Sequence, residues 1–268
     1  MSGSKDDSAP DRYIVPGLKR GLELLQICTR QPAGLGLTEA AQSLGISRSS
    51  TFRLLYTLEQ LGFVRRGTDQ RKFFAGLQVM NLRASVIQTD VSEAASEPME
   101  RLRSATGSSV HLSVLDGREV LYIRSLSGLR RVTTNIGVGT RLPAHATSMG
   151  RLLLGALSNA ELRALYRNVR LAAHTAQTVT SVAKLGELLR ADAERGYVMS
   201  EGYFDADIWS IAAPVHDHSG SVVAALSITL PANSIDKSQF RGPIKDQVRS
   251  VASGISAALG HQAPHVTT

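Results

Sequence analysis

The chain has 268 residues, enough for two domains with sizeable cores, and its 43% hydrophobic and 20% charged residues are typical of a soluble globular protein. A net charge of +7 favours a polyanion as a partner. The single cysteine, Cys28, excludes an intramolecular disulfide, and no apolar run approaches the ~20 residues of a membrane span. Residues 1–12 are polar and lack the apolar core of a signal peptide, so we expect a disordered tail on a cytoplasmic protein.

The first ordered segment, residues 13–29, carries two apolar stripes at helical spacing. One stripe must pack on the domain that follows. The other either meets a second subunit, which would make the protein at least a homodimer, or widens the face turned to the core, and the sequence leaves both readings open. The stripes are formed by Leu18, Leu22 and Leu25, and by Ile14, Leu24 and Ile27.

Residues 37–72 predict two helices joined by a tight turn. Thr38 is a candidate N-cap of the first helix, and Gly45 follows its last periodic residue, where a left-handed conformation suits glycine. Ser47 is a candidate N-cap of the second helix, which Gly62 ends. The apolar residues of the second helix, expected on its inner side, are Phe52, Leu55, Leu58 and Leu61.

Two short basic strands follow, at residues 63–66 and 71–74, separated by a turn. Helix, turn, helix and basic hairpin are typical of a winged helix-turn-helix that spans residues 13–76. The second helix would enter the major groove of double-stranded DNA, and the cations of the hairpin would contact phosphates. The same motif also serves in protein contacts, where the basic face is merely solvated. The candidate DNA-binding residues are Ser47, Arg48, Ser49, Ser50, Thr51, Arg53, Arg65, Arg66, Arg71 and Lys72.

The rest of the chain predicts a helical linker at residues 77–97 and a second domain at residues 98–260, with residues 261–268 as a tail. Pro98 is expected in the first turn of a helix. Paired strands with helices at both ends indicate an antiparallel sheet and an α+β fold class. Strands are expected at residues 110–115, 120–123, 131–136, 208–215 and 221–230, and helices at residues 148–156, 182–195 and 240–259 and after a capping box at residues 158–161.

Several segments, in the right order, resemble the isocitrate-lyase-regulator (IclR) family of bacterial transcription factors from about residue 13 to 259. They read VPGLKRGLELL, LTEAAQSLGISRSSTFRLLYTLEQLGFV, VHLSVLDGREVLYI, GTRLPAHATSMGRLLLGAL and IAAPVHDHSGSVVAALSITL. The resemblance implies a winged helix that dimerises, a helical linker and a GAF-like domain that binds a small effector, with dimers often pairing into tetramers. The ATSMGR wording is closest to the branch that controls protocatechuate and β-ketoadipate catabolism.

Two positions depart from the pattern of the family. Ser210 stands where a cysteine is common, and Asp207 where a glycine is usual. The floor of the effector pocket is therefore expected to differ in polarity and shape from that of typical members.

The effector pocket is expected where the loop before Ser148 meets the strand that begins near Ile208. Free N–H groups at a helix N-terminus favour an anion, so we expect a small organic acid. His145 contacts either its carboxylate or only the loop, and the two remain open. In the alternative reading, Ser148 only caps its helix and Ser227 lies in an outward-facing row. The candidate effector-binding residues are His145, Ser148, Met149, Ile208, Ser210, Ser227 and Thr229.

Other chemistries find little support in the sequence. His216 and His218 lack further ligands at metal-binding spacing, and residues 137–139 lack the third glycine of a dinucleotide loop. Ser210 has no G-x-S-x-G setting. We therefore expect no metal, no cofactor and no enzyme activity. The alternative is an enzyme or a non-DNA sensor that uses the helix-turn-helix only for assembly.

Overall fold

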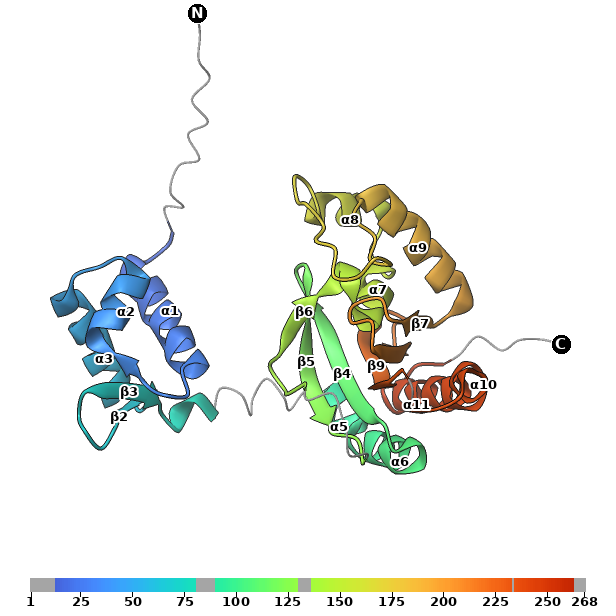
Figure 1. Ribbon diagram of the computed structural model, residues 1–268, viewed down its shortest axis with the longest axis horizontal. Helices are drawn as coiled ribbons and strands as arrows, with labels where there is room; N and C mark the ends of the chain where they lie inside the picture. The colour runs from blue at the N-terminus through green and yellow to red at the C-terminus, as the bar shows by residue number, and fades with distance from the viewer. Residues whose placement is uncertain (1–12, 81–89, 130–135, 233, 263–268) are drawn as a thin grey trace, which may run out of the picture. The chain divides into compact units, whose positions relative to one another are not determined.

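The computed structural model describes residues 13–80, 90–129, 136–232 and 234–262. The chain forms two compact units, which divide between Val86 and Ile87 (Figure 1). Each unit has its own hydrophobic core.

The N-terminal unit packs helices on a small antiparallel sheet of order β1-β3-β2. Strands β2 and β3 form the predicted basic hairpin, and β1 adds a third strand that the sequence did not indicate. The helices are α1 (Pro16–Arg30), α2 (Leu37–Leu44) and α3 (Arg48–Gln60), and the strands are β1 (Leu35–Gly36), β2 (Val64–Arg66) and β3 (Lys72–Ala75).

Three of the four predicted helix ends are confirmed. Gly45 has φ of 61° after α2, Gly62 has φ of 75° after α3, and the Ser47 hydroxyl accepts a hydrogen bond of 3.2 Å from the Ser50 N–H. The prediction of Thr38 as a cap is wrong. Helix α2 begins at Leu37, and Gly36 is its N-cap, with its N–H donating to the carboxylate of Glu39.

The buried side of α3 is rotated from the predicted one. Its buried residues are Thr51 and Leu55, whereas Phe52 is 40% and Leu61 is 58% exposed. Thr51 can lie in the interior because its hydroxyl donates to the carbonyl of Ser47, which leaves no unpaired polar group. The residues at the centre of this core are Leu24, Leu25, Cys28, Leu35, Ala40, Leu55, Val64 and Phe73.

The C-terminal unit is built on a six-stranded antiparallel sheet of order β6-β5-β4-β9-β8-β7. The predicted hairpin at residues 110–123 and the two strands near residues 208–230 are confirmed. Residues 130–135, which hold most of the strand predicted at 131–136, lie outside the described residues. The strands are β4 (Ser109–Asp116), β5 (Glu119–Leu126), β6 (Arg141–Pro143), β7 (Val198–Glu201), β8 (Ile208–His216) and β9 (Val222–Pro231).

Helices cover both faces of this sheet (Figure 1). Successive side chains of a strand point to opposite faces, so Leu112 belongs to one core and His111 to the other side. One face packs against α5 (Asp90–Ala94), α6 (Ser96–Thr106) and α11 (Lys245–Ala258). The other packs against α7 (Ser148–Leu154), α8 (Asn159–Leu165) and α9 (Val182–Arg195).

The ends of the second unit differ from the predicted boundaries. Val91 and Ala94 of α5 pack on its core, so part of the expected linker at residues 77–97 belongs to this unit; residues 81–89 lie outside the described residues. Pro98 lies in the first turn of α6, as predicted. The predicted final helix is preceded by α10 (Lys237–Gln239) and begins as a π-helical turn, Phe240–Ile244.

The position of α7 depends on a close backbone approach. The 3-10 helix η1 (Ala144–Ala146) precedes α7, and a Cβ atom on Gly150 would lie 2.1 Å from the carbonyl oxygen of Ala144. Only glycine fits at this position. This contact fixes where the first residues of α7 meet the sheet.

Candidate functional site

The exposed face of the N-terminal unit carries most of the predicted DNA contacts. Arg48 and Arg71 line one groove of about 480 Å³ between the start of α2, helix α3 and the hairpin, which brings the helix and the wing together. Exposed polar and basic side chains on α3 and the wing suit contacts with base edges and phosphates. The exposed candidates are Ser47, Arg48, Ser49, Ser50, Arg53, Arg65, Arg71 and Lys72.

Two of the predicted DNA contacts need correction. Thr51 is fully buried, so it cannot reach a DNA groove. Arg66 is partly buried, and its Nε donates to both carboxylate oxygens of Glu59 at 3.0 Å. Its guanidinium also lies 5.1 Å from the ring centre of Phe73. Arg66 therefore joins the wing to α3 instead of presenting a free cation to phosphate.

Some exposed candidates also have partners within the unit. The guanidinium of Arg65 lies 4.9 Å from the ring centre of Phe74, and the Lys72 ammonium donates to the carbonyl of Ala33 at 3.0 Å. Sequence reasoning missed an aromatic pair, Phe52 and Tyr56, whose stacked rings are exposed on α3 with centroids 6.4 Å apart. Their apolar surface lies on the same helix as the predicted base contacts.

The predicted effector residues surround one cavity of about 230 Å³ in the C-terminal unit. Six of the seven predicted residues line it: Ser148, Met149, Ile208, Ser210, Ser227 and Thr229. The sequence analysis did not identify the remaining lining residues, Tyr122, Ile136, Leu142, Thr147, Ser200, Phe204 and Asp205. Strand alternation signals Tyr122, which faces the same side as the other pocket residues of the sheet. No pattern signals Phe204 or Asp205, because they lie in a loop.

The hydroxyl groups of the cavity form a polar floor. Ser210 donates a hydrogen bond of 2.8 Å to the hydroxyl of Ser148, and Thr147 caps α7 by accepting from the Gly150 N–H at 3.1 Å. Ser227 is fully buried, and its hydroxyl has no partner among the described residues. A buried hydroxyl without a partner is costly, so Ser227 is suited to bond a molecule inside the cavity.

A buried histidine, His111, forms a hydrogen bond with one of the hydroxyls of this floor. The ring nitrogens of His111 lie 2.9 Å from the Ser125 hydroxyl and 3.0 Å from the Thr229 hydroxyl. Burial lowers the pKa of His111 to about 4, since the charged imidazolium loses its hydration. His111 is therefore neutral at pH 7 and holds Thr229 in place without adding charge.

His145 does not line the cavity. Its Nε2 lies 3.0 Å from the carbonyl oxygen of Ala172, and its ring meets Tyr166 edge-on at 6.4 Å. Of the two readings left open by the sequence, the structure shows the loop contact, and His145 is not among the residues that line this cavity.

Among the described residues that line the cavity, Asp205 carries the single formal charge. Its side chain is exposed, and a carboxylate oxygen accepts from the Asp207 N–H at 3.0 Å. A carboxylate in this cavity would thus be held by hydroxyl dipoles, with the exposed Asp205 side chain at the solvent side. Such dipoles can stabilise an anion without a cation when they are fixed in direction.

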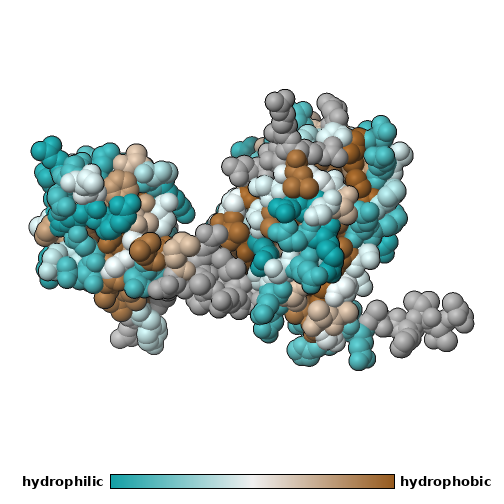
Figure 2. Space-filling model, turned by 90° about the horizontal axis from the view of Figure 1, so that it is seen from below, coloured by the Kyte–Doolittle hydropathy of each residue, from teal (hydrophilic) through white to brown (hydrophobic). Residues whose placement is uncertain are grey.

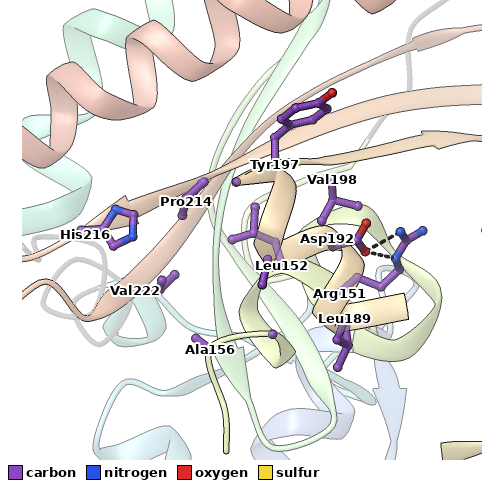
Figure 3. Close-up of a pocket in the computed structure, with 13 residues that line it drawn as sticks. Arg151, Leu152, Ala156, Leu189, Asp192, Tyr197, Val198, Pro214, His216 and Val222 are labelled. Atoms are coloured by element: carbon purple, nitrogen blue, oxygen red, sulfur yellow. Dashed lines mark hydrogen bonds and ion pairs between the residues drawn. The ribbon is translucent and has the colours of Figure 1, made fainter. Parts of the chain in front are cut away.

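A second cavity of about 360 Å³ lies on the same face of the sheet, next to the C-terminal half of α7 (Figure 3). Its wall is mainly apolar and includes Leu152, Leu189 and Val222. A buried ion pair, Arg151 with Asp192, lies at one end. The same helix therefore contributes its first residues to one cavity and its later residues to the other.

The described residues hold no group of three or more metal-binding side chains. His216 stacks on His261 with centroids 4.8 Å apart, and His218 is exposed in the turn, as expected for a solvated segment. Within the same residues, no helix is both long enough and apolar enough to span a membrane.

Comparison with protein families matches both units. Residues 17–67 match the IclR helix-turn-helix domain, and residues 83–257 match the bacterial transcriptional regulator IclR C-terminal domain. Among curated relatives, the chain is 32% identical over 248 residues to the HTH-type transcriptional repressor AllR of Salmonella paratyphi A, covering 92% of this chain and 91% of the relative. It is 29% identical over 251 residues to the HTH-type transcriptional regulator XynR of Escherichia coli, covering 93% and 99% of the two chains.

Solved structures agree. A transcriptional regulator from Rhodococcus sp. RHA1 has a TM-score of 0.82 and 30% identity, covering 92% of this chain and 98% of its own. An IclR homologue from Microbacterium hydrocarbonoxydans, complexed with 4-hydroxybenzoate, has a TM-score of 0.80 and 26% identity, covering 91% and 98%. These matches span both units and carry the names of regulators, not of enzymes. The chain therefore belongs to the IclR family of DNA-binding bacterial transcriptional regulators.

Proposed function

We propose that this regulator controls a catabolic operon in response to a small organic acid bound in the cavity next to α7. The observation that carries the proposal is the polar floor of this cavity, which is lined by the hydroxyls of Ser148, Ser210 and Thr229 and by that of Ser227, which has no partner among the described residues. A carboxylate offers the acceptors that such hydroxyls need. The IclR homologue complexed with 4-hydroxybenzoate supports the same class of effector.

The shape of the cavity supports a small ring or short chain as the body of the acid. Tyr122, Leu142 and Met149 contribute apolar surface to the lining of the cavity. At about 230 Å³ the cavity suits a compact molecule better than one of drug size. An aromatic acid fits these walls, in keeping with the resemblance to regulators of aromatic-acid catabolism.

The DNA-binding part of the proposal is a dimer that reads a roughly palindromic operator in the cytoplasm. Arg48, Ser49, Ser50 and Arg53 contact base edges, and Arg65, Arg71 and Lys72 contact phosphates. Exposed apolar side chains on α1 and just before it support the dimer, because they would otherwise face water. These side chains belong to Tyr13, Ile14, Val15, Leu18 and Leu22. Figure 2 shows apolar patches on the face of the N-terminal unit that it draws. Pairing of dimers would give a tetramer.

Thermal unfolding with added acids tests the effector class. We expect 4-hydroxybenzoate and benzoate to raise the midpoint of the C-terminal transition, and the uncharged 4-hydroxybenzamide to raise it less, because a ligand stabilises only the state that binds it. The substitutions Ser210→Leu and Ser148→Trp fill the cavity, so both should abolish the shift while operator binding persists. Ser250→Leu, at an exposed position on α11, is the matched control.

Two outcomes would contradict this proposal. A shift that survives in both filled variants would place the acid elsewhere. A larger shift with the amide than with the acid would overturn the anionic effector and favour a neutral molecule. For the assembly, light scattering at micromolar protein should give at least a dimer, and a monomer would contradict the role of α1.

A further inference from the structure

One wall of the effector cavity is the loop of residues 202–207 between β7 and β8. Phe204 and Asp205 of this loop line the cavity. Two backbone bonds close the loop, from the Gly202 N–H to the Ile208 carbonyl and from the Ile208 N–H to the Asp205 carbonyl, each at 3.1 Å. The conformation of the loop therefore decides the shape of the cavity on this side.

Tyr203 anchors the loop from outside the cavity. It is 6% exposed and does not line the cavity itself. Its carbonyl accepts from the hydroxyls of Thr178 at 2.7 Å and Thr175 at 3.0 Å, and its phenol oxygen accepts from the Val179 N–H at 2.9 Å. The neighbour of Phe204 is thus fixed to the segment that precedes α9.

Arg151 lies across the ring of Tyr203. Its Cζ is 4.8 Å from the ring centre, within the range of a cation–π contact. Its Nε donates to Asp192 of α9 at 2.9 Å, its Nη2 donates to the same oxygen, and both side chains are at least 96% buried (Figure 3). Breaking such a buried pair is costly, because it leaves each charge without its partner. The guanidinium is therefore a planar group, held by Asp192, against which Tyr203 packs.

We propose that Arg151 is a positioning residue for effector binding: held by Asp192, it fixes Tyr203 and thereby the loop that closes the cavity. Arg151 is one turn from Ser148 on α7, so one short helix supplies both a residue that lines the cavity and the support of the loop that forms another wall. The effect on effector affinity rests on the function proposed above. The effect on the loop does not.

Arg195 provides a matched control within the same cluster. It also pairs with Asp192, through the other carboxylate oxygen, but its side chain is 45% exposed and no contact with Tyr203 is present among the described residues. Arg151→Met removes the guanidinium that packs on Tyr203, while Asp192 keeps Arg195 as a partner. Arg195→Gln removes a positive charge that pairs with the same carboxylate and leaves the guanidinium of Arg151 in place. Arg151→Lys keeps the charge but not the planar group.

Hydrogen–deuterium exchange on the full chain without ligand tests the effect on the loop. In Arg151→Met, amides at residues 175–179 and 202–208 should exchange at least about tenfold faster, since their bonds depend on Tyr203. Arg151→Lys should be intermediate, and Arg195→Gln should change these amides less than about twofold. Ile255→Val, in the core on the other face of the sheet, controls for a general loss of stability. Equal acceleration in Ile255→Val and Arg151→Met, or none in Arg151→Met, overturns the proposal.

Calorimetry with 4-hydroxybenzoate tests the effect on binding. Arg151→Met should bind this acid at least about tenfold more weakly than the original chain, with unchanged retention of operator DNA. Unchanged affinity, despite faster exchange of the loop, overturns the role of Arg151 in binding. If the original chain itself does not bind 4-hydroxybenzoate, that result counts against the proposed effector, and the exchange data alone decide whether Arg151 positions the loop.

Discussion

The two sites of this protein are built in opposite ways. The DNA-binding surface takes its residues from one continuous segment, residues 47–72, and presents them to solvent on α3 and a hairpin. The effector cavity takes its residues from five strands, a helix and loop segments, and its hydroxyl groups are buried. The surface can therefore tolerate changes that leave long side chains exposed. The buried hydroxyls of the cavity cannot bond to water instead, so the loss of one partner leaves the other unpaired.

The largest expected difference between the two units is in their stability at acidic pH. All seven histidines lie after residue 110, and His111 is buried with a pKa of about 4. The pKa of His111 is lower in the folded state than the ordinary 6.5. The stability that neutral His111 contributes to the fold is therefore fully present above pH 6.5 and is lost as the pH falls toward 4. The C-terminal unit should lose about 3 kcal/mol of unfolding free energy over this range.

Urea unfolding at several pH values measures this loss. Far-ultraviolet circular dichroism follows both units, and the fluorescence of Trp209 reports the C-terminal one. His111→Gln keeps hydrogen-bonding groups but does not titrate, so its stability should depend much less on pH. A pH dependence as steep in His111→Gln as in the original chain would show that another group is responsible.

The next largest effect concerns base reading. Arg53→Ala should cost ~1–3 kcal/mol of operator binding and relax the preference at one base pair, because an arginine bonded to a base edge carries sequence information. Arg71→Ala should weaken binding to operator and to unrelated DNA by similar factors. Fluorescence anisotropy with both DNAs separates the two. Unchanged affinity and preference in Arg53→Ala would contradict the assignment of α3 to base contacts.

A smaller effect distinguishes Lys72, which has no carboxylate partner among the described residues, from Arg66, which is paired with Glu59. Lys72→Gln should reduce the slope of log affinity against log salt by ~0.9, the value for one phosphate contact. Arg66→Gln should change that slope much less, because its charge is already balanced by Glu59. It should instead destabilise the wing by about 1 kcal/mol or less. Equal changes in slope for the two variants would restore Arg66 as a phosphate contact.

The smallest effect is expected at His145. Its hydrogen bond to Ala172 supports the loop outside the cavity, so His145→Gln should cost ~0.5–1.5 kcal/mol of stability. Its affinity for an acid effector should stay within about twofold of the original, as calorimetry can show. A loss of tenfold or more would return His145 to the effector site.

Local patterns in the sequence determined most of the secondary structure. Ser47, Gly45 and the capping box at Ser158 act within a few residues, so their signals survive without tertiary information. The turn at Asp116-Gly117 predicted its hairpin for the same reason. The family resemblance, which reads the order of many such segments, placed six residues in the cavity that the structure contains.

Tertiary packing decided what local patterns could not. A periodic stripe does not tell whether Thr51 or Phe52 faces the core, because a hydroxyl bonded to its own helix can be buried. The sequence of the basic hairpin does not show that Arg66 forms an ion pair with Glu59 of α3. The loop with Phe204, and the pair of Arg151 with Asp192 behind it, come together only when α7, α9 and the sheet pack, since their residues are far apart in the chain and carry no shared local signal.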